Sequence, residues 1–235
     1  MKKCIIASTS TLYDGAYLEY LLPELEVLFN NVNEILFIPY AQPGGISCDA
    51  YTEKAAEAFQ KINKNVVGLH SFENPAQAIE KAKGIFTGGG NTFRLVNQLY
   101  KQECMGPLRE AVLNGVPYLG TSAGSNICGV TMQTTNDMPI VYPPSFKTLG
   151  IIPFNLNPHY LEPDMQSKHM GETRETRIKE FHSMNSIPVL GLREGSWLEV
   201  NSENIFLKGQ HRAIVFKQGK PPYEAEPDTD FKKLK

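Results

Sequence analysis

Short apolar runs alternate with helix-like segments through the first two thirds of the chain, and this alternation limits the folds it can adopt. Each run has the length of a buried strand, and most are followed by a segment whose apolar residues recur at helical spacing. The predicted strands are residues 4–7, 34–40, 66–69, 85–87 and 116–119. Strands that alternate with helices build a parallel sheet covered on both faces, so we predict an α/β fold with a mostly parallel central sheet.

The predicted helices carry recognisable end signals. Asn74 before Pro75 supplies a capping residue and a proline at the first helical position, and Asp49 is the expected cap of an earlier helix. Gly115 stands where a left-handed residue commonly ends a helix. The predicted helices are residues 17–29, 49–63, 75–84, 92–100, 107–114 and 172–184.

The last third of the chain has a different pattern. Residues 139–163 are rich in proline and predict loops and short strands. The tail predicts a C-terminal antiparallel strand extension, with a hairpin turn at residues 201–204. Its strands are predicted at residues 188–192, 197–200, 205–207 and 213–216. No repeat or linker interrupts the chain, so residues 1–235 are expected to form a single domain.

Charge and cysteine content narrow the function classes. The net charge is −2 and no run of Lys or Arg occurs, which argues against nucleic acid or an acidic membrane as partner and favours a small molecule. The four cysteines lie far apart without metal-ligand spacing, so free thiols and no bound metal are expected. The N-terminal apolar run is too short for a signal peptide, and no run has the roughly 20 apolar residues of a membrane span. We therefore expect a cytoplasmic protein.

The segment Gly120-Thr121-Ser122-Ala123-Gly124 follows a predicted strand and has the form of a nucleophile elbow. Such a strand-to-helix turn needs small flanking residues and lifts the serine hydroxyl above the sheet edge. The pattern also occurs by chance, and Ser122 could instead simply cap a helix.

A second turn, Gly88-Gly89-Gly90-Asn91, follows another strand of the same predicted sheet. A backbone N–H of Gly89 or Gly90, paired with that of Ala123, could form an oxyanion hole. A phosphate-binding loop is an alternative, although the spacing fits neither of the usual glycine motifs, and a flexible turn is another.

A serine nucleophile needs a base, and five histidines are available. His159 lies in the irregular proline-rich stretch, where catalytic residues are often found. His182 and His211 are expected at the solvated surface, whereas His70 and His169 remain open candidates.

Four motifs in matching order resemble the peptidase E family of serine peptidases, the aspartyl dipeptidases. They are Gly88–Thr92, Gly120–Ser125, Asn157-Pro158-His159 and Gly171–Glu175. The resemblance implies a class I glutamine amidotransferase-like fold and hydrolysis of dipeptides that begin with aspartate. No cofactor is expected, because no credible cluster of metal-ligating residues appears in the sequence.

Carried over by position, the resemblance makes Ser122 the nucleophile and His159 the general base. Either Glu194 or Asp137 matches the carboxylate that orients the histidine, and we favour Glu194 because it follows a predicted strand. Asp137 could instead meet the substrate α-ammonium. Asn91 is expected to bind substrate.

Arg174 is the expected site of aspartate recognition, because a guanidinium can bind a carboxylate bidentately. From the helix pattern alone, an ion pair with Glu175 or Glu180 would be favoured over aspartate recognition. With the resemblance, aspartate recognition is favoured over the ion pair. Arg177 is a weaker candidate for the same site.

Two alternatives remain, and a third is excluded. A cyanophycinase-like hydrolase would share the fold and the serine elbow but act on an aspartate–arginine polymer. A non-catalytic ligand-binding member of the same fold is the second. A glutamine amidotransferase would need cysteine at position 122, where this chain has serine. A monomer or a homodimer is expected.

Overall fold

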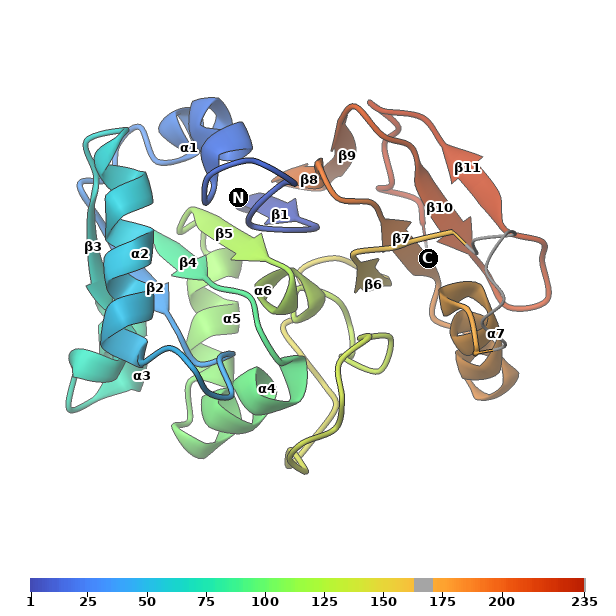
Figure 1. Ribbon diagram of the computed structural model, residues 1–235, viewed down its shortest axis with the longest axis horizontal. Coiled ribbons are helices and arrows are strands. Elements are labelled where there is room, and N and C mark those ends of the chain that lie inside the picture. Colours follow the sequence, from blue (N-terminus) through green and yellow to red (C-terminus); the bar gives the residue numbers. More distant parts are fainter. Residues whose placement is uncertain (163–170, 235) are drawn as a thin grey trace.

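The computed structural model describes residues 1–162 and 171–234 and contains two β-sheets, with most helices packed on the larger one (Figure 1). The larger sheet has seven strands in the order β3-β2-β4-β5-β1-β8-β9. The smaller has four in the order β11-β10-β7-β6 and lies at the right of Figure 1. The two sheets are joined where the short helix α6 (Ala123–Asn126), which follows β5, packs against β6.

The five strands predicted for the first half of the chain form the parallel part of the larger sheet. They are β1 (Lys3–Ala7), β2 (Glu34–Ile38), β3 (Asn65–Gly68), β4 (Ile85–Thr87) and β5 (Tyr118–Thr121). Each neighbouring pair among them runs parallel. The predicted mostly parallel α/β sheet is therefore confirmed.

Helices cover both faces of this sheet, because alternate strand residues point to opposite sides. In β1, Ile5 packs with α1 and α2, whereas Cys4 and Ile6 pack in the core that includes α3, α4 and α5. The helices are α1 (Leu22–Leu28), α2 (Cys48–Gln60), α3 (Pro75–Lys81), α4 (Thr92–Lys101) and α5 (Met105–Leu113). Short 3-10 helices lie at η1 (Glu19–Leu21) and η2 (Leu69–Ser71).

The C-terminal strands divide between the two sheets. β8 (Ser196–Asn201) and β9 (Asn204–Gly209) continue the larger sheet antiparallel beyond β1. β7 (Val189–Leu192), β10 (Ala213–Phe216) and β11 (Tyr223–Ala225) build the smaller sheet. The predicted antiparallel extension is thus present, but it belongs to two sheets rather than one.

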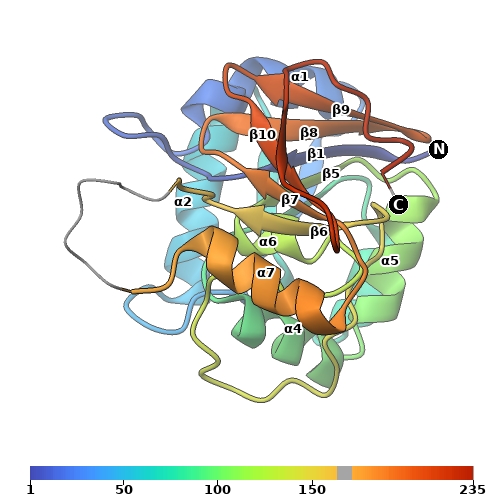
Figure 2. The same cartoon turned by 90° about the vertical axis from the view of Figure 1, so that its right-hand side faces the viewer.

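The smaller sheet also contains β6 (Asn155–Pro158), which pairs parallel with β7. β6 comes from the proline-rich stretch that predicted only loops and short strands. The helix α7 (Arg174–Met184) lies along this sheet (Figure 2). Its Ile178 packs with Tyr160 and Phe216 in a separate small core.

Some helix ends differ from the prediction. Ser47, not Asp49, caps α2, because its hydroxyl accepts a hydrogen bond from the Ala50 N–H at 3.1 Å. The Asp49 carboxylate instead pairs with His70 Nε2 at 2.7 Å. Gly115 ends α5 with φ +98°, as predicted from its position after the helix.

The four cysteines are free thiols, and Cys4, Cys104 and Cys128 are buried. Burial raises the pKa of Cys4 to about 12, so this thiol stays protonated at neutral pH. No helix within the described ranges is long and apolar enough to cross a membrane.

The junction of β5 with the short helix α6 (Ala123–Asn126) is packed more closely than a side chain would permit. A Cβ added to Gly124 would lie 2.1 Å from the Thr87 carbonyl oxygen, and one added to Gly120 would lie 2.5 Å from the Gly124 oxygen. Both obstacles are backbone atoms, which cannot move aside cheaply. The glycines of the predicted elbow are therefore required by packing.

We expect Gly124→Ala to lower the free energy of unfolding by at least about 1–3 kcal/mol, the usual cost of overpacking a core. Gly106→Ala in α5 is the matched control, since no atom lies within 4 Å of the added Cβ. It should leave stability unchanged or raise it by about 0.5–1 kcal/mol. Urea denaturation measures both, and equal losses would contradict the steric argument.

Candidate active site

Ser122 lies on the turn between β5 and α6 with φ 52° and ψ −108°, a conformation that L residues rarely adopt. Its N–H donates to the Ala7 carbonyl of β1 at 3.2 Å, which ties the turn to the neighbouring strand. Its side chain makes no capping hydrogen bond to α6. The structure therefore does not give Ser122 the simple capping role, and its hydroxyl is free for another contact.

That contact is with His159, which follows β6. His159 Nε2 lies 2.8 Å from Ser122 Oγ, and His159 Nδ1 lies 2.6 Å from Glu194 Oε1. His159 also has a positive φ, 54°. A hydroxyl, an imidazole and a carboxylate joined in this order can activate the hydroxyl as a nucleophile.

Asp137 does not contact the imidazole. Its Oδ2 accepts hydrogen bonds from the Thr92 N–H at 2.7 Å and from Thr135 Oγ1 at 2.9 Å. It therefore binds the N-terminal end of α4, where a negative charge is stabilised by the helix dipole. Of the two carboxylates left open by the sequence, the geometry favours Glu194 as the partner of His159.

The glycine turn lies directly against the nucleophile. A Cβ on Gly89 would come within 3.0 Å of Ser122 Cβ. The Gly89 carbonyl is held by Gln42 Nε2 at 2.9 Å and by the Tyr51 hydroxyl at 3.2 Å. In the described part of the chain, the N–H groups of Gly89, Gly90 and Ala123 have no hydrogen-bond acceptor. They remain available to stabilise negative charge on a substrate oxygen.

The structure gives Asn91 a different role from the predicted one. Its Oδ1 caps α4 by accepting from the Arg94 N–H at 3.0 Å, and its Nδ2 donates to the Met138 carbonyl at 2.8 Å. Both polar atoms are thereby used in holding the fold. Asn91 is not among the residues that line the cavity beside Ser122.

Arg174 is the first residue of α7 and lines the same cavity as Ser122. Arg174 is partly buried, and this burial, followed by the charge of Arg177, lowers the pKa of its guanidinium. The alternative pairing with Glu175 is not formed, because Glu175 pairs with Lys179 at 2.6 Å. Arg177 is exposed and lies 3.7 Å from Glu172, which makes it the weaker candidate.

The cavity beside Ser122 has a volume of about 190 Å³. It brings together a negative group, Asp137, and a positive one, Arg174. Its lining residues are Thr92, Ser122, Ala123, Asn126, Thr135, Asn136, Asp137, Pro158, His159 and Arg174.

Asn126 is a lining residue that the sequence patterns did not single out. Its side chain is only 1% exposed, and its Oδ1 has no hydrogen-bond partner within residues 1–162 and 171–234. A buried amide oxygen without a partner is costly, which suggests an acceptor kept for a ligand. Its position one helical turn after Ser122 was the only signal for it in the sequence.

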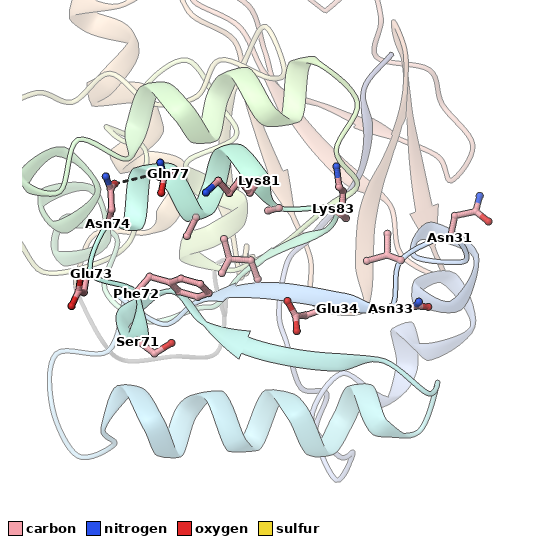
Figure 3. Close-up of a pocket in the computed structure, with 14 residues that line it drawn as sticks. Asn31, Asn33, Glu34, Ser71, Phe72, Glu73, Asn74, Gln77, Lys81 and Lys83 are labelled. Atoms are coloured by element: carbon pink, nitrogen blue, oxygen red, sulfur yellow. Dashed lines mark hydrogen bonds between the residues drawn. The ribbon is translucent and has the colours of Figure 1, made fainter.

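A larger groove of about 720 Å³ lies away from this site, between α3 and β2 (Figure 3). Its polar side chains include Glu34, Glu73, Lys81 and Lys83, and Asn74 there caps α3 by accepting from the Gln77 N–H. None of its lining residues forms a serine–histidine pair. Cavity size alone therefore does not locate the chemistry.

The other histidines have separate environments. His182, predicted at the surface, is only 8% exposed, and its Nε2 lies 3.0 Å from the Ile187 carbonyl. His211 is exposed as predicted, His70 is paired with Asp49, and His169 lies outside the described residues. Within the described ranges, no cluster of three or more His, Cys, Asp or Glu side chains could hold a metal ion.

Comparison with known proteins identifies the protein family of this chain. The model of Peptidase family S51 matches residues 4–208. A Drosophila melanogaster protein named "Probable alpha-aspartyl dipeptidase" is 44% identical over 233 residues, which cover 98% of this chain and 96% of that protein. A Streptomyces coelicolor protein named "Peptidase E" is 42% identical over 230 residues, or 98% of this chain and 93% of that protein.

The fold is also found among solved structures. A peptidase from an acI-B1 Actinobacterium superposes with a TM-score of 0.73 over 98% of this chain and 96% of that chain. The sequences are only 15% identical, so this likeness concerns the fold alone.

We expect Ser122 Oγ to displace fluoride from a serine-directed fluorophosphonate, with the phosphonylated serine located by mass spectrometry of the peptide. His159→Ala and Glu194→Gln should slow labelling by roughly 10²- to 10⁴-fold, because each removes a group that activates the hydroxyl. Asp137→Asn and the exposed-residue control His211→Ala should label within about threefold of wild type. Slower labelling of Asp137→Asn than of Glu194→Gln would contradict the assignment of Glu194.

Proposed function

The chain belongs to peptidase family S51, and from that premise we propose that it is a serine dipeptidase acting on dipeptides with an N-terminal aspartate. The observation that carries the proposal is the Ser122–His159–Glu194 row, which opens into the same small cavity as Arg174. The names of two relatives, an alpha-aspartyl dipeptidase and a peptidase E, support the choice of substrate.

Acylation begins when His159 Nε2 takes the proton from Ser122 Oγ as the oxygen attacks the aspartyl carbonyl carbon. The carbonyl oxygen becomes an oxyanion, which accepts hydrogen bonds from the Ala123 N–H and from the N–H of Gly89 or Gly90. Glu194 stabilises the imidazolium and accepts a hydrogen bond from its Nδ1–H. Collapse of the intermediate breaks the peptide C–N bond, and His159 gives its proton to the departing amine.

Deacylation repeats these steps with water. The amino acid released from the second position leaves room beside His159, which removes a proton from a water molecule as that water attacks the ester carbonyl. The Ser122–acyl bond then breaks, and Ser122 Oγ recovers a proton from His159. The products are free aspartate and the second amino acid, and the enzyme returns to its starting state.

The charges of the cavity match a zwitterionic N-terminal aspartate. Arg174 binds the side-chain carboxylate, since a guanidinium offers two parallel donors to a carboxylate. The Asp137 carboxylate keeps Oδ1 for the α-ammonium while its Oδ2 holds α4. The unpartnered Oδ1 of Asn126 is a further acceptor for the same ammonium. This pairing restricts the enzyme to the end of a peptide.

The cellular setting rests on the sequence alone. We expect the enzyme to act in the cytoplasm, as a monomer or a homodimer, on small peptides rather than on nucleic acid or lipid.

Arg174→Ala should lower kcat/KM for Asp-Leu by roughly 30- to 10³-fold, the effect of removing one partner of a desolvated charge pair. Ala-Leu lacks the side-chain carboxylate of the first residue, so it should be a poor substrate for both enzymes, and its kcat/KM should change little on substitution. Arg177→Ala is the matched control, because Arg177 is exposed and paired with Glu172. Steady-state assays with Asp-Leu, Glu-Leu and Ala-Leu test this, and equal hydrolysis of Ala-Leu and Asp-Leu by wild type would defeat the assignment.

Asp137→Asn should reduce kcat/KM for Asp-Leu by about 10- to 100-fold, mainly through KM, because a hydrogen bond to a charged group is lost. N-acetyl-Asp-Leu has no ammonium, and wild type should hydrolyse it poorly. The variant should therefore discriminate less between the free and the acetylated peptide. If wild type cleaves both peptides equally well, the ammonium is not recognised.

A further inference from the structure

Ser8 lies at the carboxyl end of β1, where the two sheets meet, and its side chain is 0% exposed. No sequence motif includes it. Its hydroxyl nonetheless lies between the two strands that carry the histidine and the glutamate of the catalytic row.

The Ser8 hydroxyl makes one hydrogen bond to each of these strands. Its Oγ donates to the Leu192 carbonyl at 2.7 Å and accepts from the His159 N–H at 2.9 Å. Leu192 is the last residue of β7 and stands two positions before Glu194. One hydroxyl thus fixes the backbone at the base and close to the carboxylate.

The preceding residue fixes the nucleophile in the same way. The Ala7 carbonyl accepts from the Ser122 N–H at 3.2 Å and from Ser125 Oγ at 2.6 Å. Ser8 N–H in turn donates to the Ser196 carbonyl at 3.0 Å, which anchors the end of β1 to β8. Ala7, the last residue of β1, and the following Ser8 therefore bond to Ser122, to His159 and to Leu192, which stands two residues before Glu194.

The backbone at His159 makes the Ser8 contact more than ordinary packing. A φ of 54° is unfavourable for a histidine and persists only where the surroundings hold it. The neighbouring Tyr160 N–H is held separately, by the Leu192 carbonyl at 3.1 Å. Within the described residues, the Ser8 hydroxyl is the acceptor for the His159 N–H.

We propose that Ser8 is a positioning residue, whose buried hydroxyl sets the orientation of His159 toward Ser122 and Glu194. The expected effect on turnover rests on the proposed function, whereas the hydrogen bonds of Ser8 do not depend on it. Ser8 does not line the cavity, so it should affect turnover rather than substrate binding.

The test is Ser8→Ala, assayed with Asp-Leu at a temperature at which circular dichroism shows the variant folded. We expect kcat to fall by roughly 10²-fold with KM within about threefold of wild type, since a small displacement of a catalytic group can cost that much. Ser8→Cys should behave alike, because a buried thiol fills the space but is a weak acceptor. It serves as the test if Ser8→Ala does not fold.

Ser196→Ala is the matched control. Ser196 is also 0% exposed, lies at the same junction, and its hydroxyl donates to the His211 carbonyl at 3.1 Å without touching His159. It should lose comparable stability but keep kcat within about threefold. Wild-type kcat in Ser8→Ala or Ser8→Cys, or an equal loss in Ser196→Ala, overturns the proposal.

Fluorophosphonate labelling of Ser122 separates this inference from the dipeptidase proposal. If wild type does not hydrolyse Asp-Leu, the substrate assignment fails, yet the labelling rate still reports how well His159 activates Ser122. Slower labelling in Ser8→Ala than in Ser196→Ala supports the positioning role whatever the substrate. Equal rates in the two variants and wild type refute it.

Discussion

The hydrogen bonds at the carboxyl end of β1 are the contacts on which the rest of the site depends. Ser122 is carried by the larger sheet, whereas His159 and Glu194 follow strands of the smaller one. The contacts of His159 with Ser122 at 2.8 Å and with Glu194 at 2.6 Å would be lost if one sheet shifted relative to the other. The carbonyl of Ala7 and the hydroxyl of Ser8 prevent that slip, because each is bonded to a segment that carries part of the row.

Local strain accompanies this arrangement. Ser122 and His159 both have positive φ values, and such a conformation costs of order 1–3 kcal/mol for a residue other than glycine. The backbone around Ser122 is closely packed, since a Cβ on Gly120 or Gly124 would collide with a backbone oxygen of α6 or β4. No glycine is adjacent to His159, and there the hydrogen bond from its N–H to Ser8 Oγ holds the backbone. The side chains of these two strained residues meet at 2.8 Å.

Much of the fold could be predicted from the sequence, because apolar period and turn chemistry are local. The parallel strands, the Gly115 helix end and the elbow at Ser122 all belong to this class. Short strands were predicted for residues 139–163, but the position of β6 was not, since Asn155–Pro158 pairs with β7, more than thirty residues later. The contact of Asp137 with α4 and the contact of Asn91 with the Met138 carbonyl also join distant segments, whereas the Asn91 cap on α4 is local. Ser8 was missed because nothing near it in the sequence shows which strands it joins.

The separation of the two carboxylates explains why one fold can use similar groups for different purposes. Glu194 is half exposed and bonded to an imidazole, and in the mechanism we propose its charge stabilises the imidazolium that forms during each turnover. Asp137 is bonded to a helix N-terminus, which holds its carboxylate in place. A fixed anion opposite Arg174 gives the cavity a dipole before any substrate arrives. Such a preorganised field favours a substrate that carries both charges on one residue over one that carries either alone, because each charge then finds its partner without reorganising the site.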